Sequence, residues 1–560
     1  MFSKYYQSEL TFLREMGAAF GRANPALAGL LAERGGDPDV ERLLEGFAFL
    51  TARVRERIDD AVPEVVQGLA ELLLPHYLRV LPASTVVEFA PLARALRARS
   101  TLPRGTEVSS TPVDGTSCLF RTTAEVDLLP LTLVETVLEN AGSSTPSLKL
   151  QFHTTVQGKA EVFQERGVTL YLHGDYPQAS TVLLWLARHC TGITVRSSEG
   201  IAPVRLPPSH LRFVGADPER ALLPWPTRAL EGFRSIQELF LSVEKFLFVS
   251  VEKLQQAAGA AGERFEMAFE LDRPPPISGR LPKDIFRLHC APVVNLFSSS
   301  ADPVATRLVG QEHLVRASGL DPQHMEVYSV DGVTGLRAGR GERRRYAPYT
   351  AFAHARGEEA TAFYRIRRAR SVLDDGMDVF LSFEAPREVP AGLEEETLSI
   401  ELTCTNRSLP TRLQVGDVSV PTPSSPSAVR FKNITAVRQP VRPPLGTELH
   451  WRLLSHLALN QRSLMDAEAL RAVMALYNFD TSADLPTSRA NALRIGSVRS
   501  VRAEPATTYA GGAPVRGTRV RVEVDEAGFA GPGDIFLFGS ALDELLAHHV
   551  SLNAFSELRV

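Results

Sequence analysis

The chain has 560 residues, which is too long for one hydrophobic core, because single cores stop growing beyond roughly 250–300 residues. Its length indicates about three or four domains, and its 44% hydrophobic and 22% charged residues are typical of a soluble protein. The 61 basic and 65 acidic residues leave a formal net charge of −4, so no overall field favours binding to nucleic acid or to an anionic membrane.

The first residues are predicted to form a helix with apolar side chains on more than one face. One face carries Tyr6, Leu10, Leu13 and Phe20, which recur at helical spacing. Other large side chains lie away from this stripe: Phe2, Tyr5 and Phe12. A helix too apolar for one domain face usually packs against a partner chain.

A second helical pattern follows Asp37, which is a predicted N-cap in front of Pro38. Its apolar residues keep the helical period for about five turns, and they are Val40, Leu43, Leu44, Phe47, Leu50, Val54 and Ile58. Pro63 separates it from a third helical stretch that runs to Leu74. Residues 1–80 are therefore predicted to be a helical hairpin or small bundle.

This helical region is also the candidate partner interface. Aromatic and large aliphatic side chains are the usual anchors of such interfaces. The residues we expect to pack against a partner are Tyr5, Tyr6, Leu10, Phe12, Leu13, Phe20, Val40, Leu44 and Phe47. The alternative is an intramolecular bundle that buries both faces.

From Leu81 the sequence changes to short β-rich segments separated by Pro, Gly, Ser and Thr clusters. The first predicted strands are Thr85–Phe89, Leu148–Phe152, Val168–Leu172 and Thr181–Trp185. Their spacing favours antiparallel sandwiches over βαβ units. Breaks are expected at Pro203–Pro208 and at Leu223–Pro226.

The second half continues this pattern and then returns to helix. Predicted strands are Arg287–Phe297, Met325–Val330, Asp378–Phe383, Ser399–Thr405, Arg519–Val524 and Ile535–Phe538. Predicted helices are Glu448–Leu459, Ala467–Leu476 behind an Asp466 cap, and Ala541–His549 behind a Ser540 cap.

Together these elements predict a multidomain α+β protein. An N-terminal helical hairpin or bundle is followed by mainly antiparallel β domains, with a few helices near the C-terminus. The predicted domains are residues 1–80, 81–222, 223–445 and 446–560.

The sequence carries no recognisable catalytic or metal-binding motif. The four cysteines (Cys118, Cys190, Cys290 and Cys404) form no CxxC pair and are expected to be small buried hydrophobes in a reducing cytosol. No P-loop, H-E-x-x-H helix or G-x-S-x-G elbow is present. We therefore expect no cofactor, no metal and no catalytic residue.

Two basic runs and one mixed block could carry chemistry. The run Arg337–Arg345 is narrower than the basic footprint that nucleic-acid binding needs. In Arg365–Arg370 the alternating arginines suggest one basic strand edge, protected from unwanted pairing. The block Gly232–Phe248 could be a catalytic site, but interlocking packing with satisfied polar groups is favoured.

No apolar run is long enough to cross a bilayer, and charged residues interrupt the N-terminal segment, so it is not a secretory signal. A cytoplasmic location without a transmembrane segment is therefore expected.

Six dense blocks of sequence, spread from end to end, resemble one family. They are Tyr5–Leu13, Asp37–Ala48, Leu74–Leu78, Gly232–Phe248, Leu402–Pro410 and Pro444–Asn460. Together they are similar to the TssF family, also called ImpG or VasA, a baseplate subunit of the bacterial type VI secretion system. Two departures are Phe233, where the family pattern has a tyrosine, and Val249–Pro282, which carries few family features.

The resemblance implies a structural subunit of the cytoplasmic baseplate wedge, at the membrane-docked baseplate, that catalyses no reaction. It also implies assembly with TssG, as two copies of this chain around one TssG, and contacts with TssK, TssE and the VgrG hub. The wedges then form the platform for sheath and tube assembly. The alternative is a multidomain β-rich carbohydrate-active enzyme or binding protein, whose site would be a loop cluster without a motif.

Overall fold

The computed structural model describes residues 6–7, 9–13, 16, 38–92, 96–139, 145–154, 167–197, 202–226, 229, 231–260, 263–277, 280–306, 311–337, 343–349, 362–371, 376–384, 396–443, 445, 452, 455, 463–479, 485–510, 513–548 and 555–560. The chain forms two compact units. Unit 1 comprises Met1–Leu73 with Leu445–Leu454, and unit 2 comprises Leu74–Pro444 with Ser455–Val560.

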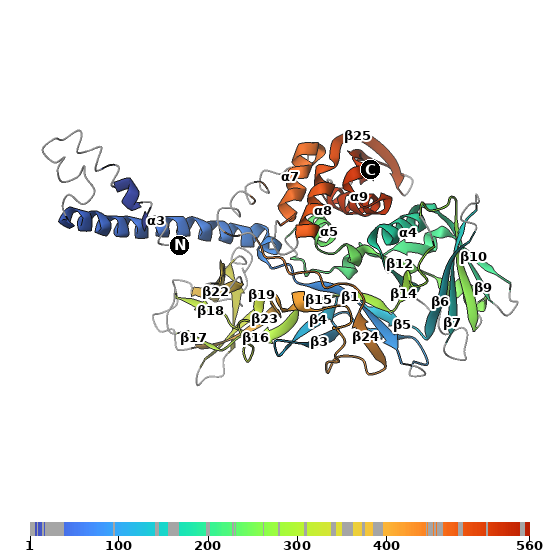
Figure 1. Cartoon of the computed structure of the whole chain (residues 1–560), viewed down its shortest axis with the longest axis horizontal. Coiled ribbons are helices and arrows are strands. Elements are labelled where there is room, and N and C mark those ends of the chain that lie inside the picture. Colours follow the sequence, from blue (N-terminus) through green and yellow to red (C-terminus); the bar gives the residue numbers. More distant parts are fainter. Residues whose placement is uncertain are drawn as a thin grey trace. The chain divides into compact units, whose positions relative to one another are not determined.

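Unit 1 is dominated by the long helix α3 (Pro38–Leu73), which has 36 residues (Figure 1). The prediction of two helices divided at Pro63 is wrong, because the helix continues through this proline. An internal proline removes one backbone hydrogen bond and bends a helix, and a long helix can continue beyond such a kink. The predicted end is confirmed, because α3 stops just before Pro75.

The predicted hairpin of unit 1 is described only in part. Residues 6–7, 9–13 and 16 are helical, as predicted. The Asp37 cap and the turn between the two helices lie outside the described residues. So does most of the predicted helix Glu448–Leu459, of which Arg452 and Ser455 are described and helical.

The first sheet of unit 2 has five antiparallel strands. In order they are β24 (Val429–Asn433), β1 (Ser84–Pro91), β15 (Cys290–Val294), β4 (Thr116–Thr122) and β3 (Glu107–Val113). Its inward side chains form a core that includes Phe89, Phe120 and Phe431. The predicted strand Thr85–Phe89 is thereby confirmed. A two-stranded sheet pairs β2 (Ser100–Leu102) with β5 (Val126–Leu128).

Two further antiparallel sheets lie in the same unit. One has the order β10 (Val204–Leu206), β9 (Cys190–Ser197), β13 (Arg264–Leu271), β7 (Ser147–Thr154) and β6 (Leu131–Glu139). The other has the order β11 (Leu211–Phe213), β12 (Phe248–Val251), β8 (Val168–Leu172) and β14 (Phe286–Leu288). The predicted strands Leu148–Phe152 and Val168–Leu172 are confirmed as β7 and β8.

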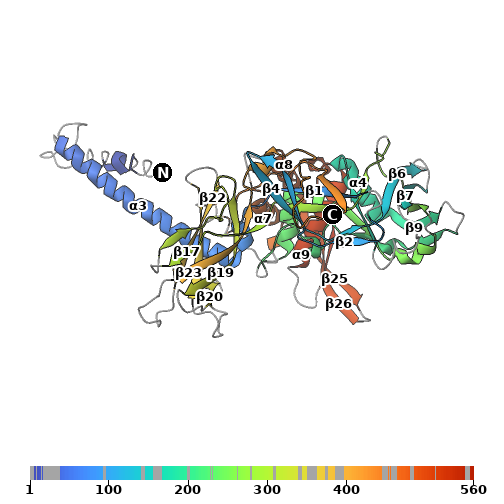
Figure 2. The same ribbon diagram turned by 90° about the horizontal axis from the view of Figure 1, so that it is seen from below.

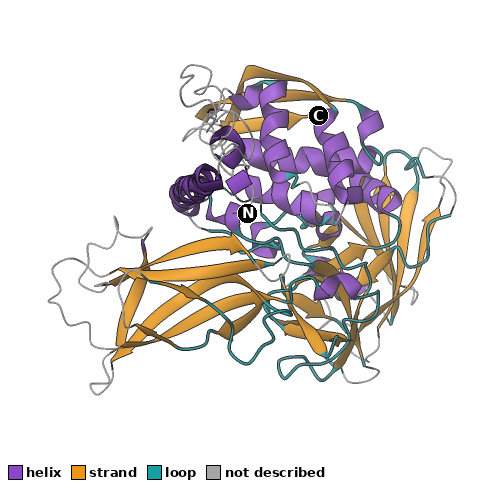
Figure 3. Cartoon of the chain, turned by 60° about the vertical axis from the view of Figure 1, so that its left-hand side comes forward, coloured by secondary structure: helices purple, strands orange, loops and turns teal. Residues whose placement is uncertain are grey.

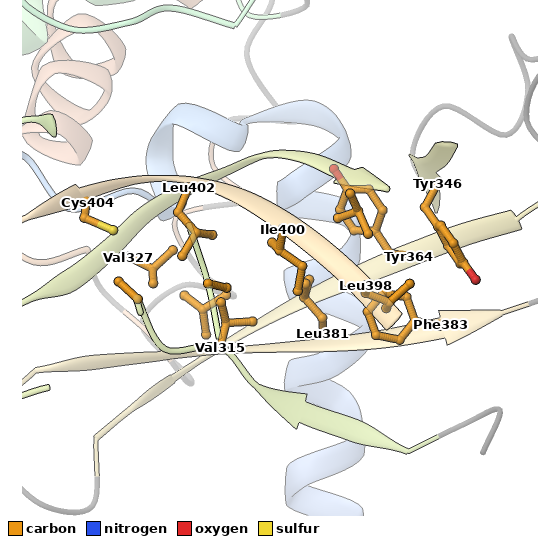
Figure 4. Packing of buried hydrophobic residues seen from close by; sticks show 14 of the residues in the cluster. Val315, Val327, Tyr346, Tyr364, Leu381, Phe383, Leu398, Ile400, Leu402 and Cys404 are labelled. Carbon is orange, nitrogen blue, oxygen red and sulfur yellow. The ribbon is translucent and has the colours of Figure 1, made fainter. Parts of the chain in front are cut away.

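The largest sheet has eight strands. They are β16 (Phe297–Ser300), β23 (Glu396–Thr405), β19 (Glu326–Arg337), β20 (Arg343–Pro348), β21 (Ala362–Arg370), β22 (Met377–Glu384) and β18 (Glu312–Leu314), with β17 (Val304–Thr306) paired to β23. Its core includes Leu381, Leu398 and Ile400 (Figure 4). The predicted strands Met325–Val330, Asp378–Phe383 and Ser399–Thr405 are confirmed as parts of β19, β22 and β23.

The arginine-rich strand β21 is not the predicted sheet edge. It lies between β20 and β22 and is hydrogen-bonded to both. Its charges are balanced by neighbours instead, since the Arg367 guanidinium donates to both carboxylate oxygens of Glu312 at 2.6 Å.

The helices of unit 2 cluster together beside the strands (Figure 3). They are α4 (Tyr176–His189), α5 (Gly232–Leu241), α7 (Ala467–Tyr477), α8 (Leu485–Gly496) and α9 (Pro532–Ala547). Unit 2 also contains a three-stranded sheet in the order β25 (Val498–Ala510), β26 (Ala513–Val524) and β27 (Phe555–Arg559). Figure 2 shows its strands β25 and β26 side by side. The predicted cap of α7 is confirmed, because Asp466 Oδ2 accepts a hydrogen bond from the Ala469 amide at 3.0 Å. Short 3-10 helices occur at Pro75–Leu78, Pro208–His210, Pro218–Arg220, Val243–Phe246, Leu254–Ala260, Leu409–Arg412, Ser463–Met465 and Glu526–Gly528.

Two predicted strands are helical in the structure. Thr181–Trp185 lies inside α4, and Ile535–Phe538 lies inside α9. The last helix therefore begins at Pro532, and Ser540 is not its cap: the Ser540 hydroxyl donates to the Phe536 carbonyl at 2.8 Å. Short apolar runs of this kind do not distinguish a buried helix from a buried strand.

The predicted strand Arg287–Phe297 is buried as expected, but it is divided into β14, β15 and the start of β16. His289, with a positive φ of 56°, separates the first two strands. The Leu223–Pro226 segment is a loop, as predicted. The four predicted domains stay a prediction, and three sheets combine strands from both sides of residue 222.

Among the described residues, no helix has the length and apolar character needed to span a membrane.

Candidate partner interface

An apolar stripe runs along one face of α3. Leu43, Phe47 and Leu50 follow one another at spacings of four and three, which places them on the same side of the helix. Their exposed fractions are 67%, 62% and 63%, respectively. We call these three residues the α3 stripe.

The opposite face of α3 is buried and small. Ala48 and Ala52 are fully buried, and at about 100° per residue they lie roughly half a turn away from the α3 stripe. Alanine side chains let another element approach the helix axis closely. Around residues 43–52 the helix therefore buries alanines and exposes the large apolar side chains of the α3 stripe, which is the reverse of an ordinary surface helix.

The predicted interface residues near the N-terminus divide into two groups. Tyr6, Leu10 and Leu13 are half-buried, whereas Phe12 is 56% exposed. Phe12 is therefore more exposed than the residues of the predicted Tyr6–Leu13 stripe, in agreement with its predicted place on another face of the helix. Tyr5 and Phe20 lie outside the described residues.

Of the predicted interface residues in α3, Phe47 is exposed and Leu44 is half-buried. Val40 lies in α3, but its side chain is outside the described residues. Leu43 and Leu50, which are not among the predicted interface residues, are exposed on the same side as Phe47. The signal was present, because both belong to the same helical period as Phe47.

The block Gly232–Phe248 lies inside unit 2 and packs internally, as predicted. Every residue of α5 is buried. The Lys245 ammonium donates to Glu238 Oε2 at 2.5 Å, and both side chains are buried. Glu238 Oε1 also accepts from the Leu223 amide at 2.9 Å, so this carboxylate is used on both oxygens. The buried charges of this block are therefore paired within unit 2.

A close helix contact explains the glycine that begins α5. A Cβ atom added at Gly232 would lie 2.7 Å from Leu545 Cα, in the last turn of α9. The two helix backbones therefore touch at this point, and only glycine fits there without a shift of one helix. Ser235 of α5 donates a hydrogen bond to Glu544 of α9 at the same crossing.

The four thiols are unsuited to catalysis. Cys118, Cys290 and Cys404 are buried and Cys190 is half-buried, all as free cysteines. Burial raises the pKa of the Cys118 thiol to about 11, and that of Cys190 also to about 11, so neither is a thiolate near neutral pH. In the part of the chain that the structure describes, no cluster of three or more His, Cys, Asp or Glu side chains could hold a metal ion.

The comparisons with known proteins agree over the whole chain. The family described as type VI secretion system, TssF, matches residues 1–560. A Pseudomonas aeruginosa protein, type VI secretion system component TssF1, is 31% identical over 600 residues, covering 99% of this chain and 95% of the relative.

Two solved structures share the fold. A chain of the type VI secretion system TssK–TssF–TssG baseplate subcomplex is 33% identical, with a TM-score of 0.79, covering 93% of this chain and 96% of that one. A chain of a type VI secretion system baseplate complex is 27% identical, with a TM-score of 0.58, covering 100% of this chain and 96% of that one. The chain described here therefore belongs to the TssF family of the type VI secretion system.

Proposed function

We propose that this chain is a structural subunit of the baseplate wedge and that the α3 stripe is its contact with TssG. The proposal is supported by the likeness to a chain of the TssK–TssF–TssG subcomplex, over 93% of this sequence. That complex shows which partners a chain of this fold can assemble with. The α3 stripe is the feature of this chain that fits a permanent partner.

The exposed fraction of the α3 stripe carries the proposal. Each of its three side chains is more than 60% exposed, and full burial of one such side chain is worth about 1.5–3 kcal/mol. In a monomer these side chains stay in contact with water, so this free energy of burial is not gained. A partner with a complementary apolar groove gains it on assembly, and a central aromatic such as Phe47 is a typical anchor.

The proposal also covers the stoichiometry of the wedge and its other partners. Two copies of the chain bind one TssG, and the wedge also contacts TssK, TssE and the VgrG hub. The wedge lies in the cytoplasm at the membrane-docked baseplate and supports the growth of sheath and tube. The chain acts through large interfaces and catalyses no reaction.

The experiment is co-expression with the TssG of the same gene cluster, followed by size exclusion with light scattering. The expected species has the mass of two of these chains and one TssG. A folded chain that elutes alone while TssG is soluble beside it would overturn the proposal. A stable complex of another stoichiometry would retain the contact and overturn the two-to-one arrangement.

A further inference from the structure

Three arginines lie side by side on the three-stranded sheet of unit 2. Arg502 of β25 is paired in register with Arg521 of β26, and Arg521 is paired with Arg559 of β27. We call these three residues the arginine row. Neighbouring strands are about 4.8 Å apart, so the three side chains start from adjacent positions on one face of the sheet. Like charges directly opposite each other destabilise a sheet.

The arginine row lies on the exposed face of this sheet. All three arginines are exposed. Side chains alternate between the two faces of a strand, and Val520 and Val522, on the other face of β26, are 0% and 2% exposed. The buried face therefore belongs to the core of unit 2, and the face with the arginine row is open to a partner.

Two arginines of the row have no carboxylate bound to them. Arg502 and Arg521 make no hydrogen bond or ion pair with any residue that the structure describes. Glu523 of β26 accepts a hydrogen bond from the Ser500 hydroxyl at 2.6 Å instead. This bond, and then the charges of Arg502 and Arg521, lower the pKa of Glu523. Glu523 is thus within the field of both guanidinium groups and pairs with neither.

The third arginine shares its carboxylate. Arg559 Nη2 donates to Glu557 Oε1 at 2.9 Å. The other oxygen of Glu557 accepts from Arg519 Nε, also at 2.9 Å. One carboxylate therefore serves two guanidinium groups, and the row as a whole keeps hydrogen-bond donors for an anionic ligand.

The spacing of the row fits an acidic helix that crosses the strands. The three arginine positions extend over about 10 Å in two steps of about 4.8 Å. Residues i, i+3 and i+7 of a helix share one face and lie at about 0, 4.5 and 10.5 Å along its axis. Carboxylates at these positions therefore match the three guanidinium groups one to one.

The neighbours of the row disfavour an extended polyanion. The next row of the sheet pairs Glu504 with Arg519 and Arg519 with Glu557, and Glu523 lies on the opposite side of the arginine row. A nucleic acid, whose charges continue on both sides of its contact, would meet these carboxylates. A helix with one narrow acidic stripe avoids them.

We propose that the arginine row docks the acidic face of a helix from one of the partner subunits, TssG or TssK, with carboxylates at positions i, i+3 and i+7. The charge-assisted hydrogen bonds of this contact relieve the repulsion within the row. The inference rests on the proposed baseplate function and adds a second contact, separate from the α3 stripe.

The test replaces the central arginine by Arg521→Gln. Binding of purified TssG–TssK from the same cluster is measured by calorimetry at low salt, together with the thermal midpoint of the unbound chain. We expect about fivefold weaker binding, the upper worth of an exposed ion pair. The midpoint should stay unchanged or rise, because repulsion within the row is reduced. Arg521→Lys keeps the charge and should retain most of the affinity.

Arg516→Gln is the matched control. Arg516 also lies in β26, is exposed, and makes no ion pair with the described part of the chain. Its odd spacing of five residues from Arg521 places it on the opposite face of the strand. This variant removes the same charge and should leave the affinity unchanged.

Several results would overturn the inference and leave the baseplate function intact. They are unchanged TssG–TssK affinity for Arg521→Gln, an equal loss for Arg516→Gln, or a lower midpoint for Arg521→Gln, which would mean that the chain itself uses this arginine. Binding of a DNA duplex that Arg521→Gln abolishes, with TssG–TssK affinity unchanged, would assign the row to nucleic acid.

The helical spacing is tested by competition. A helical peptide with glutamates at i, i+3 and i+7 should displace TssG–TssK from the row better than an isomer with glutamates at i, i+2 and i+5. Equal competition by both peptides would overturn the helical ligand. A wild-type chain that does not bind TssG–TssK would overturn the proposed function, and this inference with it.

Discussion

Helices α3 and α5 use apolar residues in opposite ways. In α5 every residue is buried, and an internal ion pair, Glu238–Lys245, lies at its C-terminal end. In α3 the large side chains Leu43, Phe47 and Leu50 are exposed, and alanines are buried. A helical apolar period therefore does not say whether the chain or a partner covers it. The exposed fraction of the side chains shows whether the chain itself covers them.

The largest loss of stability is expected when the buried ion pair Glu238–Lys245 is disrupted. Glu238→Ala leaves the Lys245 ammonium buried without its partner. Loss of one member of a buried ion pair costs about 3–5 kcal/mol of unfolding free energy. Urea unfolding of the chain measures this loss.

The control for this variant is an exposed pair in α3, Arg42–Asp39 at 3.5 Å. Asp39→Ala should cost less than about 1 kcal/mol, because solvent screens exposed ion pairs. Equal losses for the two variants would contradict the view that the buried ion pair of unit 2 stabilises the chain more than the exposed pair in α3.

The next effect is a dependence on pH. Burial lowers the pKa of His289 from 6.5 to about 4, and its Nε2 accepts a hydrogen bond from the Leu129 amide at 3.0 Å. Between these two pKa values the unfolded chain takes up a proton and the folded chain does not. Stability is therefore full above pH 6.5 and falls as the pH approaches 4, by about 3 kcal/mol in total.

Thermal unfolding at pH 7 and pH 5 checks this prediction. His289→Asn should reduce the difference between the two midpoints, because asparagine tolerates the positive φ at this position and does not titrate. The same difference in both proteins would show that other groups cause the acid sensitivity. No histidine occurs in α3, so its helicity should not follow this titration.

Replacing a glycine by alanine should change stability in opposite directions in α5 and in α3. Gly232→Ala places a Cβ atom 2.7 Å from Leu545 Cα and should cost about 1–3 kcal/mol. The thermal midpoint of the purified chain reports this change. A neutral result would show that α5 and α9 can move apart, and that their contact is loose.

The opposite sign is expected at Gly46 in α3, where an added Cβ atom meets nothing within 4 Å. Gly46→Ala should stabilise the helix by about 0.5–1 kcal/mol, because alanine loses less backbone entropy. Circular dichroism at 222 nm during heating measures this gain. A loss of helicity would mean that α3 is packed more tightly at this position than its open surroundings indicate.

The sequence predicted most elements whose signal is local. Asp466 was identified as a helix cap from its own side chain and the residues behind it, and alternating strands such as β7 were found from their own pattern. The strands predicted at Thr181–Trp185 and Ile535–Phe538 were wrong because a short apolar run does not distinguish a helix from a buried strand. Local pattern cannot supply this information, because burial depends on residues far away in the chain.

Other features depend on contacts between residues far apart in the chain and could not be predicted from the sequence. The inner place of β21 follows from its neighbours β20 and β22. Leu43, Phe47 and Leu50 share one helical period in the sequence, whereas the exposure of all three required the structure.

The most direct measurement compares Phe47→Asp with Phe49→Asp. Phe49 is also exposed and lies two residues further along α3, on a different face from the α3 stripe. Both thermal midpoint and TssG affinity are measured, with Phe12→Asp as a further variant of the interface. We predict that Phe47→Asp keeps the midpoint and weakens binding by at least about thirtyfold, since an interface anchor is worth 2 kcal/mol or more. Wild-type affinity for Phe47→Asp, or an equal loss for Phe49→Asp, would contradict the assignment of the α3 stripe as the TssG contact.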